Sequence, residues 1–146
     1  MAEGTETLDK VLHLSTLVGA DMERFQRDSG LTSARIHLLW VVGSAGPSTQ
    51  QSLAVALGVS ARNITGLVDG LVSSGHVTRE PHPTDRRALL VTPTAAGQTA
   101  IRELVESHEH LAGQLFGHLP PDRLADFAAT LDETIATFAR LMEEAT

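Results

Sequence analysis

The stretch from residue 48 to residue 71 constrains the fold most, because it predicts two short helices joined by a tight turn. Ser48 is a candidate N-cap for the first helix, and Gly58 lies where a helix needs a left-handed closing residue. Ser60 is a candidate N-cap for the second helix. Apolar residues follow at helical spacing and predict one buried stripe: Ile64, Leu67, Val68 and Leu71. The pattern is typical of a helix-turn-helix.

The opposite face of the second helix carries small and polar side chains. They are Ala61, Arg62, Asn63, Thr65, Gly66 and Asp69. Such a face suits a helix that lies in the major groove of DNA, where Arg can pair with guanine and Asn with adenine. On these residues alone, the alternative is an ordinary corner between two helices of a helical protein.

A predicted β-hairpin follows the helix pair. Residues 76–80 and 88–92 read as strands, and the loop between them carries the adjacent Arg86 and Arg87. A helix-turn-helix followed by a basic hairpin is the winged-helix arrangement. The alternative is that these arginines form only a solvated hairpin tip.

Four further helices are predicted from apolar periodicity, at residues 6–28, 32–45, 93–116 and 121–143. Thr32 is the candidate N-cap of the second of these helices. Thr92 is the candidate N-cap of the third, with Pro93 at its first helical position. The fold class is therefore mainly α, with a small hairpin wing.

The outer helices carry broader apolar faces than a compact central segment needs. In the last helix the apolar residues recur close to a heptad seam: Leu124, Phe127, Leu131, Ile135, Phe138 and Met142. We therefore interpret 1–146 as one domain in which 31–92 forms the winged helix, and 6–28 and 93–144 supply dimerisation helices. The alternative is that the last helix packs only against the protein's own first helix.

Composition and charge exclude several classes of protein. The chain has 146 residues and no Cys, so disulfides, Cys-based zinc sites and thiol redox sensing are excluded. The acidic N-terminus lacks the apolar run of a signal peptide, and no stretch has the length of a membrane span. We therefore expect a cytoplasmic protein without a membrane partner.

The net charge of −7 is unevenly distributed. Residues 31–92 carry five arginines against three acidic residues, a net charge of +2. The rest carries six basic against fifteen acidic residues, a net charge of −9. The positive charge therefore lies in the segment that is suspected of binding DNA, although five arginines make a modest electrostatic footprint.

Three motifs resemble the MarR family of transcription regulators. They are the Leu57-Gly58-Val59-Ser60 turn within residues 50–71, Gly75-His76-Val77-Thr78-Arg79 before the wing, and Asp85-Arg86-Arg87 followed by Leu90-Val91-Thr92-Pro93-Thr94-Ala95-Ala96-Gly97. The last of these is similar to the family's wing pattern of Asp-x-Arg, apolar residues and Leu/Val-Thr-x-x-Gly. With the flanking helices, the resemblance covers nearly the whole chain.

The resemblance implies a homodimer whose terminal helices intertwine and whose subunits each present one winged helix to double-stranded DNA. It also implies that Arg87 enters the minor groove and that Asp85 holds it by an ion pair. Many relatives carry basic residues where this chain has Gly66 and Gly70. Each substitution by Gly removes a possible phosphate contact and costs the helix about 1 kcal/mol relative to Ala.

These expectations assign candidate DNA-binding residues. We expect Arg62, Asn63 and Thr65 to meet base edges, with Gly66 allowing close approach, and Arg86 to meet phosphate. Ser60, Thr49 and Gln50 are candidates for phosphate contact at helix N-termini.

Members of the family often respond to small aromatic or phenolic acids, which relieve DNA binding. His13, His37 and Trp40 are the candidates to line such a pocket. The alternative is that Trp40 belongs to the core and that the histidines are partly buried or exposed. We expect no cofactor.

Three other functions compete with a DNA-binding repressor. A metal-responsive regulator would use His108, Glu109, His110 and His118, but 108 and 110 point to different faces of a helix. An enzyme is disfavoured because the chain lacks Gly-x-Ser-x-Gly, phosphate-loop and dinucleotide motifs and a Cys nucleophile. The third is a winged helix that binds proteins and lacks strong DNA binding.

Overall fold

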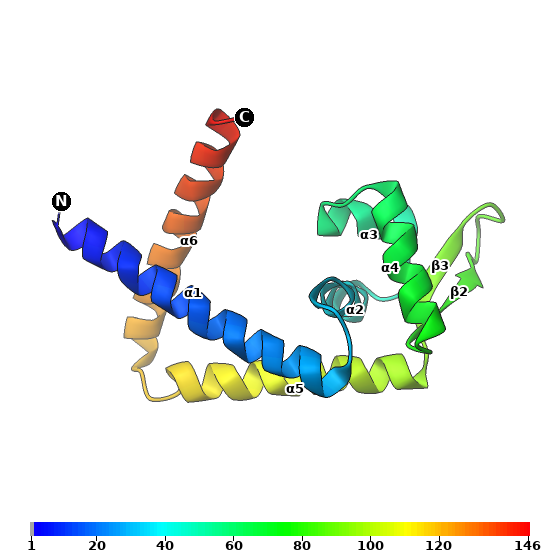
Figure 1. Cartoon of the computed structure of the whole chain (residues 1–146), viewed down its shortest axis with the longest axis horizontal. Coiled ribbons are helices and arrows are strands. Elements are labelled where there is room, and N and C mark those ends of the chain that lie inside the picture. Colours follow the sequence, from blue (N-terminus) through cyan, green and yellow to red (C-terminus); the bar gives the residue numbers. More distant parts are fainter. Residues whose placement is uncertain (1) are drawn as a thin grey trace. The chain divides into compact units, whose positions relative to one another are not determined.

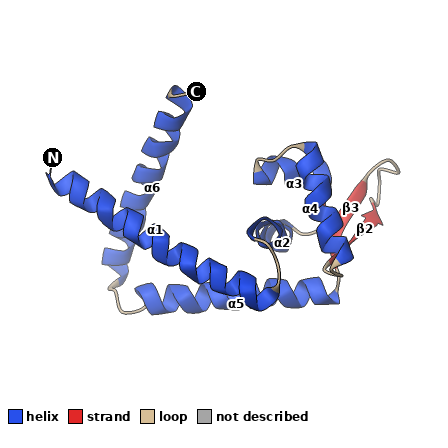
Figure 2. Cartoon of the chain, viewed as in Figure 1, coloured by secondary structure: helices blue, strands red, loops and turns tan. Residues whose placement is uncertain are grey.

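The computed structural model describes residues 2–146 and confirms a mainly helical winged helix-turn-helix (Figures 1 and 2). The elements in chain order are α1 (Ala2–Ser29), α2 (Ser33–Ala45), β1 (Ser48–Thr49), α3 (Gln50–Leu57), α4 (Ala61–Ser73), β2 (Val77–Pro81), β3 (Leu89–Pro93), α5 (Ala95–Phe116) and α6 (Pro121–Glu144). The predicted helices and the hairpin are all present, with ends within a few residues of the predicted ones.

The chain groups into two compact units that divide inside α5, one ending at Leu104 and the other running from Val105 to Thr146. The first unit contains the buried apolar core. Its fully buried large side chains come from α2, α3, α4 and both hairpin strands: Leu38, Leu39, Val42, Leu53, Ile64, Val68, Leu71, Val77 and Val91. The helix-turn-helix and the hairpin therefore share one core, which fixes their relative positions.

The turn between α3 and α4 forms as its residues predict. Gly58 has φ +67° and ψ +34°, the left-handed conformation that a glycine adopts without a Cβ penalty. The Ser60 hydroxyl accepts a hydrogen bond from the backbone N–H of Asn63 at 3.1 Å and caps α4. Of the predicted stripe, Ile64, Val68 and Leu71 are buried.

The sheet has three antiparallel strands in the order β1-β3-β2, one more than the sequence predicted. In β1, Ser48 pairs with Val91 and Thr49 pairs with Leu90. The prediction that Ser48 caps the first helix was therefore wrong. Thr49 takes that role, because its hydroxyl accepts a hydrogen bond from the N–H of Ser52 at 3.2 Å.

The prediction that Thr92 caps α5 was also wrong, because β3 continues to Pro93. The cap is Thr94, whose hydroxyl accepts from the N–H of Gly97 at 3.1 Å and donates to the Gly75 carbonyl at 2.6 Å. The N–H of Thr94 donates to the His76 carbonyl at 3.0 Å. Thr94 thus joins the start of α5 to the base of the wing.

Large apolar side chains are exposed along α1 in the first unit and along α6 in the second unit. On α1 they are Leu8, Val11, Leu12, Leu14, Leu17, Val18 and Met22, and on α6 they are Phe127, Leu131, Ile135, Phe138, Leu141 and Met142. Ile135 and Phe138 are 65% and 62% exposed. Proteins that are stable as single chains rarely expose apolar faces of this extent.

Candidate nucleic-acid interface

The outward face of α4 is open to solvent, as the sequence predicted. Arg62, Asn63 and Gly66 are exposed, and a Cβ built on Gly66 would meet nothing within 4 Å. Within residues 2–146, the guanidinium of Arg62 has no hydrogen bond or ion pair, so its five donors remain available. This face is small and flat with one free cation, which fits the geometry of a groove-binding helix.

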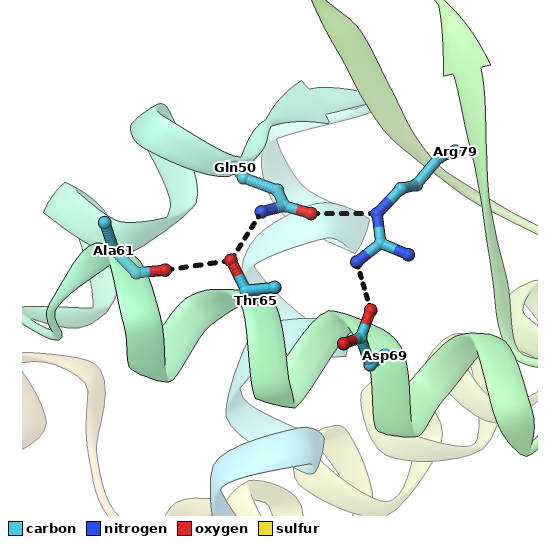
Figure 3. A network of polar contacts seen from close by, with 5 residues as sticks. All are labelled: Gln50, Ala61, Thr65, Asp69 and Arg79. Carbon is cyan, nitrogen blue, oxygen red and sulfur yellow. Dashed lines mark hydrogen bonds and ion pairs between the residues drawn. The ribbon is translucent and has the colours of Figure 1, made fainter.

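A polar network links the start of α3, the middle of α4 and strand β2 (Figure 3). Gln50 donates from its amide to the Thr65 hydroxyl at 3.1 Å, and Thr65 in turn donates to the Ala61 carbonyl at 2.9 Å. Arg79 donates from Nε to the Gln50 side-chain oxygen at 2.9 Å and forms an ion pair with Asp69. The side chains of Gln50 and Thr65, which we expected to meet DNA directly, are therefore bonded to each other and hold the wing strand against α4.

Sequence reasoning missed the role of Arg79. Arg79 was counted only as one of five basic residues and as part of a motif before the wing. Its partners Gln50 and Asp69 lie 29 and 10 residues away along the chain. The available signal was a single acidic residue on the polar face of α4 and a single basic residue in the first hairpin strand, but pairing them requires the tertiary register.

The wing tip between β2 and β3 is ordered by local hydrogen bonds. Nδ1 of His82 accepts from the backbone N–H groups of Thr84 at 3.2 Å and Asp85 at 3.1 Å. The N–H of His82 donates to the Ala88 carbonyl at 3.1 Å, which closes the loop. The imidazole therefore acts as an acceptor at the centre of the tip, a contribution that the sequence did not indicate.

Asp85 contacts Arg87 differently from the prediction. Its Oδ1 accepts from the backbone N–H of Arg87 at 3.0 Å, and no ion pair joins it to the Arg87 guanidinium in the described part of the chain. A short Asp side chain reaches a backbone N–H two residues on more easily than it reaches the end of an Arg side chain. Arg86 and Arg87 are both exposed. The tip is thus held through its backbone while both guanidinium groups are left free.

Comparison with known proteins assigns the family. The MarR family model matches residues 29–88. The multiple antibiotic resistance protein MarR of Escherichia coli is 33% identical over 102 residues, which cover 70% of this chain and 69% of that protein. The chain belongs to the MarR family.

The chain is also similar to a second regulator in sequence and to a DNA-bound protein in fold. The uncharacterised HTH-type transcriptional regulator YcgE of Bacillus subtilis is 38% identical over 64 residues, which cover 44% of this chain but only 42% of that protein. The crystal structure of Streptococcus pneumoniae FabT in complex with DNA has a TM-score of 0.77 and 18% identity, with 94% of this chain and 96% of that chain covered. At that identity the likeness shows the fold alone. This MarR-family chain is thus a transcriptional regulator by family, with the DNA-binding winged-helix fold.

The residues that we expected to line an effector pocket do not line either of two hollows on the surface of the first unit. His13 lies exposed on α1, His37 lies exposed on α2, and Trp40 is half-buried against the core. One hollow, of about 570 Å³, is lined by Glu23, Gln26, Arg27, Gly30, Leu31 and Thr32. The other, of about 390 Å³, is lined by residues of α2, β3 and α5, which include Val42, Pro93, Ile101 and Arg102, and by Pro47 of the connection between α2 and β1.

Between Ala2 and Thr146, no group of three or more His, Asp or Glu side chains is placed to hold a metal ion. Over the same residues, no single helix has the length and apolar character needed to cross a membrane; α3 and α4 reach them only when taken together, and they are bent by 109°.

Proposed function

We propose that this protein is a homodimeric DNA-binding transcriptional regulator that reads a pseudo-palindromic operator and represses transcription. The observation that carries the proposal is the pair of free cationic surfaces on one winged helix. One is Arg62 on the open face of α4, and the other is Arg86 with Arg87 at the wing tip. In a chain with a net charge of −7, these unpaired arginines are the groups that can meet phosphates and grooves.

The free and the bonded side chains of the site divide the roles. Arg62 and Asn63 have side chains open to solvent and are assigned to base edges in the major groove. The hydroxyls of Ser60 and Thr49 accept from backbone N–H groups and keep a proton that can be donated to a phosphate. Thr65 and Gln50 are assigned to positioning, because their polar groups bond to each other and, for Gln50, also to Arg79.

The wing supplies the second contact. Arg87 is assigned to the minor groove, where narrow A·T tracts concentrate negative potential and attract a guanidinium. Arg86 is assigned to a phosphate. The backbone hydrogen bonds of His82 and Asp85 support this assignment, since an ordered tip presents both arginines with less entropy to lose on binding.

Dimerisation is supported by the apolar faces of α1 and α6. Neither helix has a buried residue in the single chain, although both carry apolar residues at helical spacing. A second copy of the chain covers such faces, so that 31–92 forms the DNA-binding part and 6–28 with 93–144 forms the dimerisation part. Two subunits related by a two-fold axis place half-sites about one DNA turn apart. E. coli MarR is a relative by sequence, and FabT, which has the same fold, was solved with DNA.

The test is selection of bound duplexes from a random DNA pool at two salt concentrations. Wild type is compared with Arg87→Ala, Arg62→Ala and Arg140→Ala. Arg140 is the matched control, because its substitution removes the same charge from α6, where Glu144 is its only ion-pair partner among residues 2–146. We expect a pseudo-palindrome that weakens with salt. Arg87→Ala should weaken binding to all selected sequences. Arg62→Ala should cost about 1–3 kcal/mol of binding free energy and reduce the base preference at one position of the site. The control should bind as wild type.

Absence of any enriched duplex with a folded dimer would contradict DNA binding and favour a protein-binding winged helix. An enriched site without internal symmetry would contradict the proposal that a homodimer binds a pseudo-palindromic operator. Repression is tested separately by placing the selected site over a promoter and measuring the transcript with and without the protein. A higher transcript level with the protein would contradict repression. Relief of binding by a small aromatic acid stays a prediction, tested by adding small aromatic and phenolic acids to the same binding assay.

A further inference from the structure

The side chain of Arg35, in the first turn of α2, lies directly over Gly70 of α4. A Cβ built on Gly70 would stand 2.5 Å from both Nε and Nη2 of Arg35 and 2.6 Å from its Cζ. These distances are shorter than any real Cβ contact, so the guanidinium occupies the place where a side chain at position 70 would begin. The absence of a side chain at Gly70 therefore leaves a space on α4 that Arg35 of α2 fills.

The Arg35 guanidinium has no acceptor within residues 2–146. The hydrogen bond recorded for this residue runs from its backbone N–H to the Thr32 hydroxyl, and neither ion pair of the described chain includes it. It is also a cation in the first turn of a helix that has no acidic residue there. The positive end of a helix disfavours a cation, so this half-buried guanidinium stands in an unfavourable place unless an anion joins it.

Arg35 lies on the flank of α4 opposite to the polar network. Residues three, four and seven apart share one side of a helix, which places Gly70 with Asn63 and Gly66. Thr65 and Asp69 form the other flank, where Arg79 bonds from the wing strand. Each flank of the helix is therefore covered by an arginine from a different element. Arg79 is neutralised by Asp69, whereas Arg35 has no such partner in the described chain.

We propose that Arg35 is a DNA-phosphate contact that α2 delivers across Gly70 to the edge of the recognition helix α4. The proposal rests on the proposed DNA-binding function. We expect Arg35 to bind a backbone phosphate beside the major groove, because a planar guanidinium with free donors matches phosphate geometry. The neighbouring Asn63 and Gly66 face the groove in the same proposal. Gly70 acts as the spacer that permits this contact.

The expected effect is on the salt dependence of binding. Losing one phosphate contact lowers the slope of log K against log salt by about 0.9, so a dimer that loses two contacts should lose about 1.8. Between 50 and 200 mM salt, that slope difference makes the wild-type affinity fall about 12-fold more than the affinity of the variant.

Four variants of the full chain test the proposal on the operator selected above. Arg35→Ala removes the guanidinium. Gly70→Ala puts a methyl group where the guanidinium lies, and Gly113→Ala is the control because it makes the same change in open space on α5, outside the DNA-binding part. The double variant Arg35→Ala with Gly70→Arg restores the charge directly on α4. Circular dichroism and sedimentation establish that each variant is a folded dimer.

We expect Arg35→Ala and Gly70→Ala to flatten the salt slope, Gly113→Ala to leave it unchanged, and the double variant to restore it. Wild-type slope in Arg35→Ala would overturn the proposal while leaving the proposed function intact. Equal flattening by Gly113→Ala and Gly70→Ala would also overturn it, because the effect would then not depend on the place that the Arg35 guanidinium occupies. Failure of the wild type itself to bind any duplex would instead overturn the proposed function.

Discussion

Replacing Gly97 with Ala is the most direct test of how the wing is attached to α5. Gly97 is buried at the start of α5, and a Cβ there would stand 1.9 Å from the backbone oxygen of His76. That same oxygen accepts the N–H of Thr94 at 3.0 Å, so a methyl group displaces a carbonyl that is already bonded. The obstacle is backbone at the foot of β2 and cannot rotate away as a flexible side chain could.

The cost of Gly97→Ala can be worked out from three contributions. Overpacking against backbone costs about 3 kcal/mol, at the upper end of the usual range. Losing the Thr94–His76 hydrogen bond costs about 1 kcal/mol. Replacing Gly by Ala within a helix returns about 1 kcal/mol. The free energy of unfolding should therefore fall by about 3 kcal/mol.

Urea unfolding followed by circular dichroism, at fixed protein concentration because a dimer is proposed, measures this change. With a slope of about 2 kcal/mol per molar urea, the midpoint should fall by about 1.5 M. Gly66→Ala is the control, since its methyl meets open space and it should raise the midpoint by about 0.5 M. A Gly97→Ala midpoint at or above that of wild type would refute the close approach of α5 to the wing base.

Three further outcomes are expected. Thr94→Ala should cost about 1 kcal/mol in urea unfolding, whereas Thr92→Ala should cost less than half as much, because only Thr94 caps α5; equal costs would contradict the cap. A double-mutant cycle of Asp69→Asn and Arg79→Gln should give a coupling of about 0.2–1 kcal/mol, since Asp69 is 60% exposed and Arg79 26%; zero coupling would argue against the ion pair. Ile135→Glu should shift sedimentation towards the monomer, and an unchanged dimer would place the interface elsewhere.

The parts of the fold that the sequence predicted correctly depend on residues close together in the chain. Thr32 and Ser60 were predicted as N-caps because each hydroxyl meets an N–H three residues later. Gly58 was predicted as the closing residue because α3 needs a left-handed position there. In each case the physical cause and its effect lie within one turn of helix, so no knowledge of the tertiary structure was required.

The two wrong caps have the same kind of cause, which is strand pairing: Ser48 pairs with β3, and Thr92 and Pro93 pair with β2. Pairing of Ser48 with Val91 extends the sheet to a segment more than forty residues away. Once Ser48 and Thr49 are strand residues, the start of α3 moves one residue along the chain. At the other strand, β3 continues through Thr92 to Pro93, so the start of α5 moves two residues along. Ser48 and Thr49, like Thr92 and Thr94, all carry a hydroxyl that can cap a helix, so only the strand pairing decided which residue does so.

The candidate site was predicted in its exposed residues and missed in its supporting ones. Arg62, Asn63, Arg86 and Arg87 could be found because polar residues opposite an apolar stripe, or at a hairpin tip, must face solvent. The contacts of Arg79 could not be found in this way, since they join α3, α4 and β2 through side chains. Periodicity indicates which way a residue points, but it does not indicate which residue of another element it meets.

Gly66 and Gly70 also show that the sequence does not indicate which residue of another element a position contacts. Both lie on α4 one turn apart, and both lower its helical propensity. By the family resemblance, both also stand where many relatives have a basic residue. The sequence therefore predicts the same effect on DNA binding for both glycines. In the structure Gly66 borders empty space, whereas Gly70 is covered by the Arg35 guanidinium. If Arg35 binds a phosphate as proposed, α2 supplies the charge that is missing at position 70, whereas nothing supplies the charge that is missing at position 66. The DNA-binding surface would then carry one more arginine on that flank than residues 48–71 alone provide.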